Sequence, residues 1–174
     1  MIEATERKLR EAQFFLRHLL AESGKAVRNE PEAFGFYLSA LLSAARSVTF
    51  ALQYEEKDKY DTWFPTWLQN RNTEEQALLE FMKSQRNYEQ KRGGTEVTVV
   101  WEYIPVTQVK AETRGHPAYY GFHWFGPPGT PPPTVGIPVH LFEASGGDRQ
   151  VVAACQRYVG LLAELVRDFV QAHP

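Results

Sequence analysis

The stretch Ala33–Gln53, AFGFYLSALLSAARSVTFALQ, decides the fold. Its only formally charged residue is Arg46, and apolar or small residues lie on every side of the helix that it would form. About 21 residues at roughly 1.5 Å per residue make a rod of about 30 Å, the width of a small domain. A helix that is apolar all round is covered by neighbours on several sides. We therefore expect it to be the central buried helix, with the other segments packed around it.

Three further long helices are predicted around this one. Apolar residues recur at three-and-four spacing over 5–22, which is typical of an amphipathic helix. The TEEQ sequence at 73–76 is a capping box that begins a helix over 74–91. Asp148 can cap a last helix, which reaches Ala172 and carries a clean apolar stripe. Asn29 is likewise a good N-cap for the central helix.

A short aromatic element is expected between the central helix and the TEEQ helix. The charged run YEEKDKYD over 54–61 breaks the apolar pattern, and TWFPTWLQN follows it. Because Pro65 interrupts this segment, we expect a short helix or a capped turn. Large rings on a short element mostly serve packing, so the aromatic side chains should lie across the bundle; a platform for stacked bases is the alternative.

The segment 95–143 changes from helical to strand patterns. Apolar and polar residues alternate over 95–104, and 118–125 and 134–142 resemble two further strands. The GPPGTPPP sequence between the last two cannot form regular structure, because proline lacks an N–H donor. We expect a small antiparallel sheet with one face packed on the bundle, and Pro138 at a sheet edge or a bulge.

The fold class that follows is mainly α, a bundle of four to five helices that carries a three-stranded antiparallel sheet. The length of 174 residues suits one hydrophobic core, so 1–174 is predicted to be a single domain. The bundle comprises 5–94 and 148–172. The β insertion, 95–143, lies between the fourth and last helices and contains the proline-rich loop 126–133.

Composition narrows the function classes. The net charge of −2 argues against coating nucleic acid through bulk charge, although a local basic patch stays open. Cys155 is the only cysteine, which excludes an intrachain disulfide and a cysteine-cluster metal site. The chain has no P-loop, dinucleotide fingerprint, HExxH sequence or nucleophile elbow, so we expect no metal and no cofactor. A charged start without an apolar signal core, and Arg46 inside the longest apolar run, predict a cytoplasmic protein without a membrane span.

Arg46 is the first candidate functional residue. A guanidinium keeps its charge and is costly to bury without a partner. One interpretation is that Arg46 reaches the surface or pairs with a carboxylate of the bundle. The other is that it lines a pocket for phosphate or another small anion.

A basic patch lies near the end of the fourth predicted helix. Its cations surround Glu89 and are Lys83, Arg86, Lys91 and Arg92. Positions five apart on an ideal helix differ by about 140°. Arg86 and Lys91 therefore cannot both face one small ligand unless the helix bends or ends, or a second chain supplies one of them. The patch suits an anionic partner; the alternative is a solvated helix end whose cations interact with the helix dipole.

The helix order resembles the HEPN superfamily of small helical proteins, many of them RNases of toxin-antitoxin, defence and RNA-processing systems. The resemblance covers about residues 5–94 and the last helix, and it rests on the LLSAARSVTFALQ helix, the WFPTW segment and the Arg86-Asn87 pair. In that family an arginine, often followed by asparagine, precedes a histidine by four to six intervening residues. Two copies commonly dimerise, so that two motifs form one metal-independent cleft for RNA. The resemblance implies a homodimer in which Arg86 and Asn87 contact RNA.

The histidine of that motif is absent here. Lys91 follows Arg86 after four intervening residues and Arg92 after five. Lysine, with a reference pKa of about 10.4, is a poor general base, and arginine supplies only charge. Loss of a general acid or base lowers a rate by roughly 100- to 10,000-fold, so we expect a weak RNase or none. Four histidines are candidate substitutes that no spacing supports: His18, His116, His123 and His140.

The leading prediction is an HEPN-like RNA-associated protein, a degenerate metal-independent endoribonuclease of toxin or defence type. The candidate catalytic residues are Arg86, Asn87 and Lys91, and the candidate phosphate contacts are Arg46, Lys83 and Arg92. The competing hypothesis is a non-catalytic dimeric interaction module, whose aromatic and proline-rich insertion binds an antitoxin-like protein partner. A third is a small-molecule pocket around Arg46.

Overall fold

A computed structural model of the chain describes residues 2–25, 32–92, 94–105, 127, 129–143 and 149–174. It is mainly helical, with a small two-stranded antiparallel sheet. The elements in chain order are α1 (Glu3–Ser23), α2 (Ala33–Glu55), α3 (Lys57–Gln69), α4 (Thr73–Arg92), β1 (Val97–Pro105), β2 (Thr134–Phe142) and α5 (Val151–Ala172). The prediction of a helical bundle with an antiparallel insertion before the last helix is confirmed at this level.

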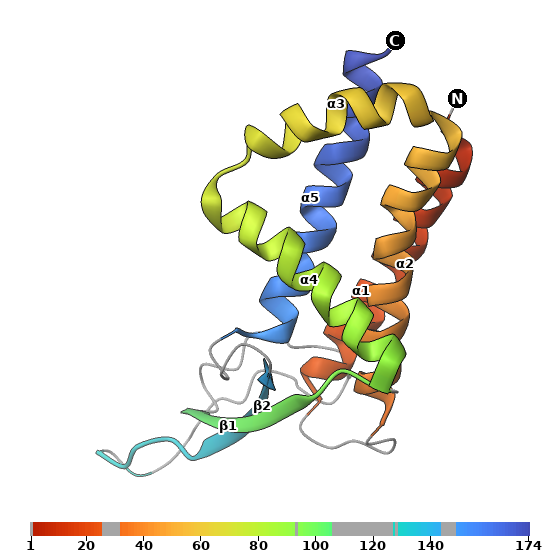
Figure 1. Cartoon of the computed structure of the whole chain (residues 1–174). Helices are drawn as coiled ribbons and strands as arrows, with labels where there is room; N and C mark the ends of the chain where they lie inside the picture. Colours follow the sequence, from red (N-terminus) through yellow and green to blue (C-terminus); the bar gives the residue numbers. More distant parts are fainter. Residues whose placement is uncertain (1, 26–31, 93, 106–126, 128, 144–148) are drawn as a thin grey trace.

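The long helices α1, α2 and α5 run along one another, and both ends of the chain lie at the same end of this group (Figure 1). Helix α3 crosses that end, and α4 slants across the bundle towards the sheet. One hydrophobic core joins them. Its largest fully buried side chains are Leu19, Leu38, Leu41, Leu42, Val48, Leu52, Met82, Phe142, Val151, Leu161, Leu162 and Leu165. Because α2 and α5 supply most of these, α2 is a core helix, and the predicted apolar stripe of α5 is confirmed.

Helix α2 is buried on one side, where α1, α3, α4 and α5 contact it, so the expectation that neighbours cover it on several sides fails for its outer face. Leu41 and Ala45 are fully buried, whereas Phe36 is 65% exposed and Tyr54 90% exposed. The neighbouring helices reach α2 from the side that carries Ala45, and its apolar outer face stays at the surface of the described chain. Helix α2 is also long and apolar enough to cross a membrane. However, 44% of its most apolar 18-residue stretch is buried in the bundle. A core helix meets the same criteria, so this is weak evidence for a membrane span.

The start of α2 differs in part from the expectation. The predicted N-cap, Asn29, lies outside the described residues. The N-cap residue is Glu32, directly before Ala33, and its side chain makes no cap hydrogen bond. At the other end of α2, Glu55 caps a different helix: its carboxylate accepts hydrogen bonds from the backbone N–H groups of Ala4 and Thr5 and from the Thr5 hydroxyl.

Helix α3 is longer than the predicted short element. It includes most of the charged run, and Pro65 lies inside it. The proline removes one intrahelical hydrogen bond, but the aromatic rings hold the segment against α5. Trp67 donates from Nε1 to Asp168 Oδ2 at 3.0 Å, and the rings of Trp63 and Phe169 meet edge to face with centroids 5.4 Å apart. The predicted packing role of the aromatics is therefore confirmed.

Helix α4 follows the predicted range, but its capping box begins one residue earlier than expected. Asn72 Oδ1 accepts from the Glu75 N–H at 2.9 Å, and the Glu75 carboxylate accepts from the Asn72 N–H at 3.3 Å. Gln76, expected to return to Thr73, instead donates to the carbonyl of Arg71. Asparagine caps a helix at least as well as threonine, so the first good cap residue of NTEE is used.

Burial along α4 and the start of α5 also depart from the predictions at single positions. On α4 the apolar Ala77 is exposed, whereas the polar Gln85 is buried, against the usual preference of both residue types. Asp148, the expected cap of α5, lies outside the described residues, and Gln150 occupies the cap position without a side-chain hydrogen bond.

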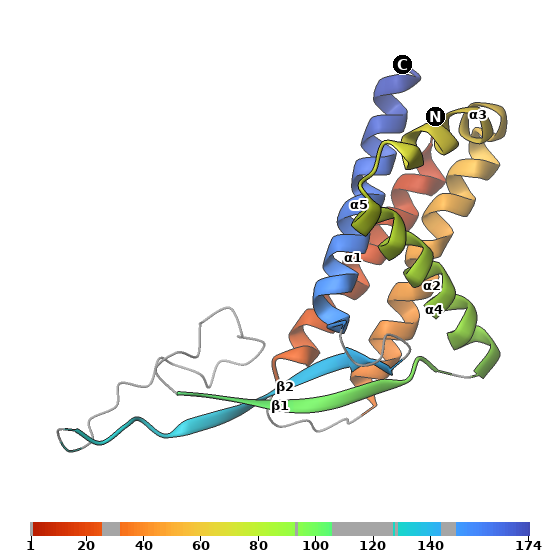
Figure 2. The ribbon, with the colours of Figure 1, turned by 60° about the vertical axis from the view of Figure 1, so that its left-hand side comes forward.

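The sheet consists of β1 and β2, paired antiparallel from Val97 opposite Phe142 to Pro105 opposite Thr134. It extends away from the end of the bundle (Figure 2). The predicted third strand, 118–125, lies outside the described residues. The expectation that one face of the sheet packs on the bundle is confirmed only near its base, on the face of β2 that carries His140 and Phe142; the middle residues of β1 are exposed on both faces. Only the base of the sheet reaches the core, where Phe142 is fully buried.

Candidate functional site

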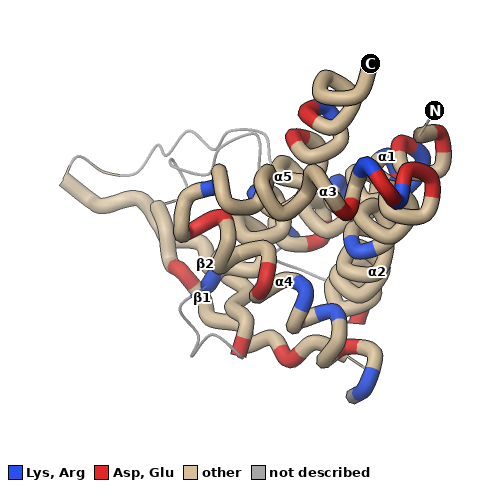
Figure 3. The backbone as a smooth tube through the Cα atoms, turned by 45° about the horizontal axis from the view of Figure 1, so that its top comes forward, with Lys and Arg blue, Asp and Glu red and all other residues tan. Residues whose placement is uncertain are grey.

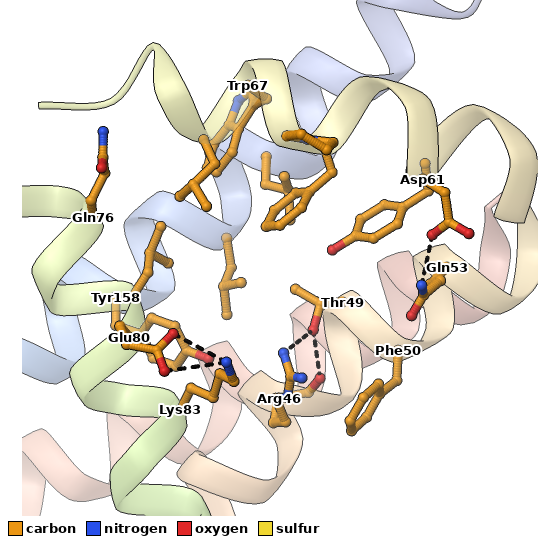
Figure 4. A pocket seen from close by; sticks show the side chains of 17 residues that line it. Arg46, Thr49, Phe50, Gln53, Asp61, Trp67, Gln76, Glu80, Lys83 and Tyr158 are labelled. Carbon is orange, nitrogen blue, oxygen red and sulfur yellow. Dashed lines mark hydrogen bonds and ion pairs between the residues drawn. The ribbon is translucent and has the colours of Figure 1, made fainter.

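A cavity of about 510 Å³ lies between α2, α3, α4 and α5 (Figure 4). It forms because α3 and α4 meet α2 and α5 at steep angles, so the four helices cannot close on one another along their lengths. Its apolar lining comes from Phe50, Phe64, Pro65, Trp67, Leu68, Leu79, Leu162 and Leu165. Its polar lining comes from Arg46, Thr49, Gln53, Tyr60, Asp61, Gln76, Glu80, Lys83 and Tyr158.

Arg46 provides a cation in this cavity that pairs with no carboxylate of the described residues. Its Nη1 donates to Thr49 Oγ1 at 3.0 Å, and its guanidinium carbon lies 4.3 Å from the centre of the Phe50 ring. A hydroxyl and an aromatic face orient a guanidinium without neutralising it. The interpretation in which Arg46 pairs with a carboxylate of the bundle is therefore wrong for the described chain, and its remaining donors are available to an anion.

Lys83 reaches the same cavity from α4 (Figure 4). Its Nζ lies 3.2 and 3.1 Å from the two carboxylate oxygens of Glu80, one turn earlier on the helix. The Lys83 side chain is half-exposed and that of Glu80 mostly exposed, and such surface ion pairs contribute only about 0–1 kcal/mol. The lysine can therefore leave Glu80 for a stronger anion at little cost.

Two buried tyrosines complete the polar part of the cavity. Burial raises the pKa of Tyr60 and of Tyr158 to about 12, although the nearby Arg46 charge lowers each of them. Both phenols are therefore protonated at neutral pH, and each can donate one hydrogen bond. Together with Arg46 they make this region rich in donors.

The arrangement suits binding rather than a reaction on the ligand. A guanidinium cannot act as a general acid or base near neutrality, and the tyrosine hydroxyls do not ionise there. The carboxylates on the lining, Asp61 and Glu80, are engaged with Lys57 and Lys83 respectively. What the cavity offers is a charged, donor-rich region beside an aromatic and aliphatic wall.

The structure separates the other predicted site residues. Acidic residues predominate at the start of α4 and basic ones near its end (Figure 3). Arg86 is half-buried, and its Nε is buried without a hydrogen-bond acceptor in the described chain. Asn87 and Lys91 are exposed. Because α4 is continuous through both positions, Arg86 and Lys91 of one chain point in different directions, as the helical spacing required. The side chain of Arg92 lies outside the described residues.

The histidines considered as substitutes have packing roles where the structure describes them. The ring of His18 stacks on Tyr37 with centroids 5.0 Å apart, and the ring of His140 stacks on Phe34 at 3.7 Å. His116 and His123 lie outside the described residues. Within the described ranges, no group of three or more His, Cys, Asp or Glu side chains is placed to hold a metal ion.

A family model described as bacteriophage lambda protein ea47 matches residues 2–146, most of the chain. The chain belongs to this family. The ea47 match includes α1 to α4 and both strands, and so contains Arg46, Lys83 and the aromatic residues of α3. It ends before α5, which supplies Tyr158 to the cavity. No curated protein and no solved structure matches the chain.

Sequence reasoning singled out Arg46 and Lys83, and the structure brings them together. It missed Thr49, Tyr60 and Tyr158 as polar lining. Tyr158 belongs to the apolar stripe of α5, and nothing in a periodic pattern shows that one stripe residue carries its hydroxyl into a cavity. The single signal was Arg46 itself, because an unpaired guanidinium on an apolar helix requires hydrogen-bond acceptors or an anion nearby.

Proposed function

We propose that this member of the ea47 family binds a small anionic ligand with an aromatic or apolar body in the cavity between α2, α3, α4 and α5. The observation that carries the proposal is the convergence of Arg46 and Lys83, from two different helices, on one cavity with aromatic walls. The anionic group of the ligand lies against the Arg46 guanidinium and the Lys83 ammonium. Its body packs against the aromatic wall to which Phe64 and Trp67 contribute.

The size and lining of the cavity support this class of ligand. Sites for small molecules are concave, mostly apolar, and carry a few polar groups that fix orientation; their volumes are about 300–1,000 Å³. A volume of about 510 Å³ lies inside that range. An apolar ligand without charge would leave Arg46 desolvated and unpaired, which is costly. An anion compensates that charge through hydrogen bonds of about 1.5–3 kcal/mol each.

Two fluorescent probes test the proposal. One is 8-anilinonaphthalene-1-sulfonate, an aromatic sulfonate, and the other is N-phenyl-1-naphthylamine, which has a similar body without the anion. We expect Arg46→Ala to weaken binding of the sulfonate by about 10-fold or more, as the loss of one charge-assisted hydrogen bond requires, and to leave the neutral probe little changed. Lys83→Gln should likewise weaken binding of the sulfonate and leave binding of the neutral probe unchanged.

Lys91→Gln is the matched control, because Lys91 is an exposed cation on the same helix that does not line the cavity. It should bind both probes as the wild type does. Equal binding of the sulfonate by wild type and Arg46→Ala would overturn the proposal, and so would a loss in Lys91→Gln as large as that in Lys83→Gln.

RNA is a second candidate partner, favoured by the half-buried Arg86 and its unpaired Nε. In this proposal, which follows the HEPN resemblance, Arg86 contacts phosphate on the outer part of α4. The test is binding and cleavage of a fluorescent single-stranded RNA in EDTA at two salt concentrations, with Arg86→Ala beside the wild type. Metal-independent cleavage that the variant loses supports an RNase, and salt-sensitive binding without cleavage supports a degenerate relative. A wild type that neither binds nor cuts removes RNA as a partner.

A further inference from the structure

The outer face of α2 carries a regular pattern that the bundle does not use. Six uncharged side chains lie on it at intervals of four and three residues: Phe36, Ala40, Ser43, Ser47, Phe50 and Tyr54. We name this row the α2 seam. The three aromatic members are 65%, 47% and 90% exposed, in chain order. Alternating intervals of four and three keep a row on one side of a helix, and this is the spacing through which paired helices pack.

The intervals of the α2 seam, four, three, four, three and four residues, are the same in both directions. Its ends are aromatic and its middle is small. Consider a second copy of α2 that runs antiparallel to the first, with the twofold axis at the level of Ala45. Residues equally far from position 45, one before it and one after it, then lie opposite each other. The pairs are Phe36 with Tyr54, Ala40 with Phe50, and Ser43 with Ser47. In each pair that contains Phe50 a large ring meets a methyl group, and at the centre two small side chains let the helices approach closely.

We propose that the chain forms a twofold homodimer through antiparallel contact of its two α2 seams. A twofold interface uses the same patch on both subunits, so the patch must complement itself, and the α2 seam does. The row spans about 18 residues and hence roughly 27 Å, long enough for several turns of contact. Formally charged residues, which are depleted at the centres of interfaces, are absent from all six positions.

A groove at the seam lies where Phe50 of the second copy would contact this chain. It runs between α2 and the end of α4 and is lined by Phe36, Ser39, Ala40, Ser43, Glu89 and Gln90. In the antiparallel register, Phe50 of the second copy lies opposite Ala40 and enters this groove. The 47% of Phe50 that is exposed in one chain is then covered by the other. An aromatic side chain in a matching hollow is the usual energetic centre of an interface.

The dimer also brings the two ligand cavities together. The twofold axis of the dimer passes between the two α2 helices, at right angles to both. The flank of α2 that carries Arg46 therefore lies on the same side of the dimer in both copies. Phe50, which lines the cavity and supports Arg46, is then held between its own chain and the second copy. Self-association through the seam does not require the ligand, so it stands or falls separately from the proposed function.

A charge-swap experiment tests the register at the centre of the seam. In Ser43→Glu/Ser47→Glu, and likewise in Ser43→Lys/Ser47→Lys, like charges face each other in both symmetric pairs. If each pair weakens association about 10-fold, we expect a dissociation constant about 100-fold above that of the wild type by sedimentation equilibrium. A mixture of the two variants should form a heterodimer, because opposite charges then meet.

The control for this experiment is Ser84→Glu, on an exposed position of α4, which should associate as the wild type does. Circular dichroism establishes that each variant keeps its helix content. A wild type that stays monomeric at about 100 µM overturns the proposal. Dimers that survive both charge substitutions overturn it as well. Flotation of a monomeric wild type with vesicles of phosphatidylcholine and phosphatidylglycerol would assign the face to a membrane instead.

Disulfide cross-linking tests the direction of the two helices. Phe36→Cys mixed with Tyr54→Cys should form a disulfide-linked heterodimer on oxidation, because these positions face each other. Each variant alone should not, since its two thiols lie about 27 Å apart along the antiparallel pair. Cys155 does not interfere, because it is fully buried, and burial raises the pKa of its thiol. Cross-linking of each variant with itself would show a parallel pair and overturn the proposed register.

Discussion

Glu55 shows how a single side chain joins two helices. Three donors at the start of α1 converge on its carboxylate at 2.8, 2.9 and 2.6 Å. Ile2, at the cap position of α1, makes no side-chain cap hydrogen bond, so a residue at the end of α2 does the capping. Burial raises the pKa of Glu55, but the hydrogen bonds from Thr5 and Ala4 outweigh it, and the pKa lies below its ordinary value.

We expect Glu55→Gln to lower the free energy of unfolding at pH 7 by about 0.5–2 kcal/mol, the range for a lost helix cap. Because the folded-state pKa is lowered, this stabilisation is fully present above the ordinary pKa of about 4.3. It disappears as the pH falls through the folded-state value. Urea unfolding of both proteins at pH 7 and at about pH 3 checks it. A difference between them that stays constant with pH would show that the charge of Glu55 plays no part.

The sequence identified Arg46 as a candidate functional residue, but it gave no sign that Glu55 caps α1. A cation inside an apolar run stands out, because burying it has a known cost. A carboxylate at position 55 stands in a charged run, and the sequence does not show that residues 4 and 5 lie beside it. The fifty-residue separation of Thr5 and Glu55 makes that contact a property of the packed pair α1 and α2.

The start of α4 provides a test at the scale of one element. Asn72 and Glu75 exchange hydrogen bonds there, whereas Thr73 sits one position inside the helix. Asn72→Ala should lower the free energy of unfolding by about 1 kcal/mol, because it leaves a backbone N–H of the first turn without its acceptor. Thr73→Ala, the matched control, should change it by no more than about 0.5 kcal/mol. Urea unfolding measures both variants. An equal decrease in the free energy of unfolding would show that Asn72 is not the specific cap residue.

The elements themselves were largely predictable, whereas their faces were not. The apolar stripes of α1 and α5 and the period-two alternation of β1 are local signals, and these elements begin and end near the predicted residues. Helix α2 was expected to be covered by neighbours on several sides, because apolar or small residues lie all round it. Periodicity measures contrast between faces, so it cannot tell a core-facing row from an apolar row at the surface. The cavity depends on the angles at which α3 and α4 cross the bundle, which no local pattern encodes.

At the scale of the whole molecule, the sheet and the bundle join through few residues. The exposed middle of β1, including Trp101 at 51% and Tyr103 at 69%, contributes little to the core. The base of the sheet, in contrast, is part of the core. Phe142 is fully buried, and its ring meets Phe81 of α4 edge to face with centroids 5.2 Å apart. His140, two residues earlier on the same face of β2, stacks on Phe34 of α2. The sheet is therefore anchored to the bundle from one face of β2.

This anchoring predicts very different costs for two aromatic substitutions in the same sheet. Phe142→Ala should lower the free energy of unfolding by about 3–5 kcal/mol, because it opens a cavity where α4, α5 and the sheet meet. Tyr103→Ala removes a ring of similar size from an exposed site and should cost about 0.5 kcal/mol or less. Urea unfolding monitored by helical circular dichroism measures both. If Tyr103→Ala proved as costly as Phe142→Ala, the outer part of the sheet would have to contribute to the stability of the bundle. A loss confined to Phe142→Ala would instead show that one buried ring couples the sheet to the helices.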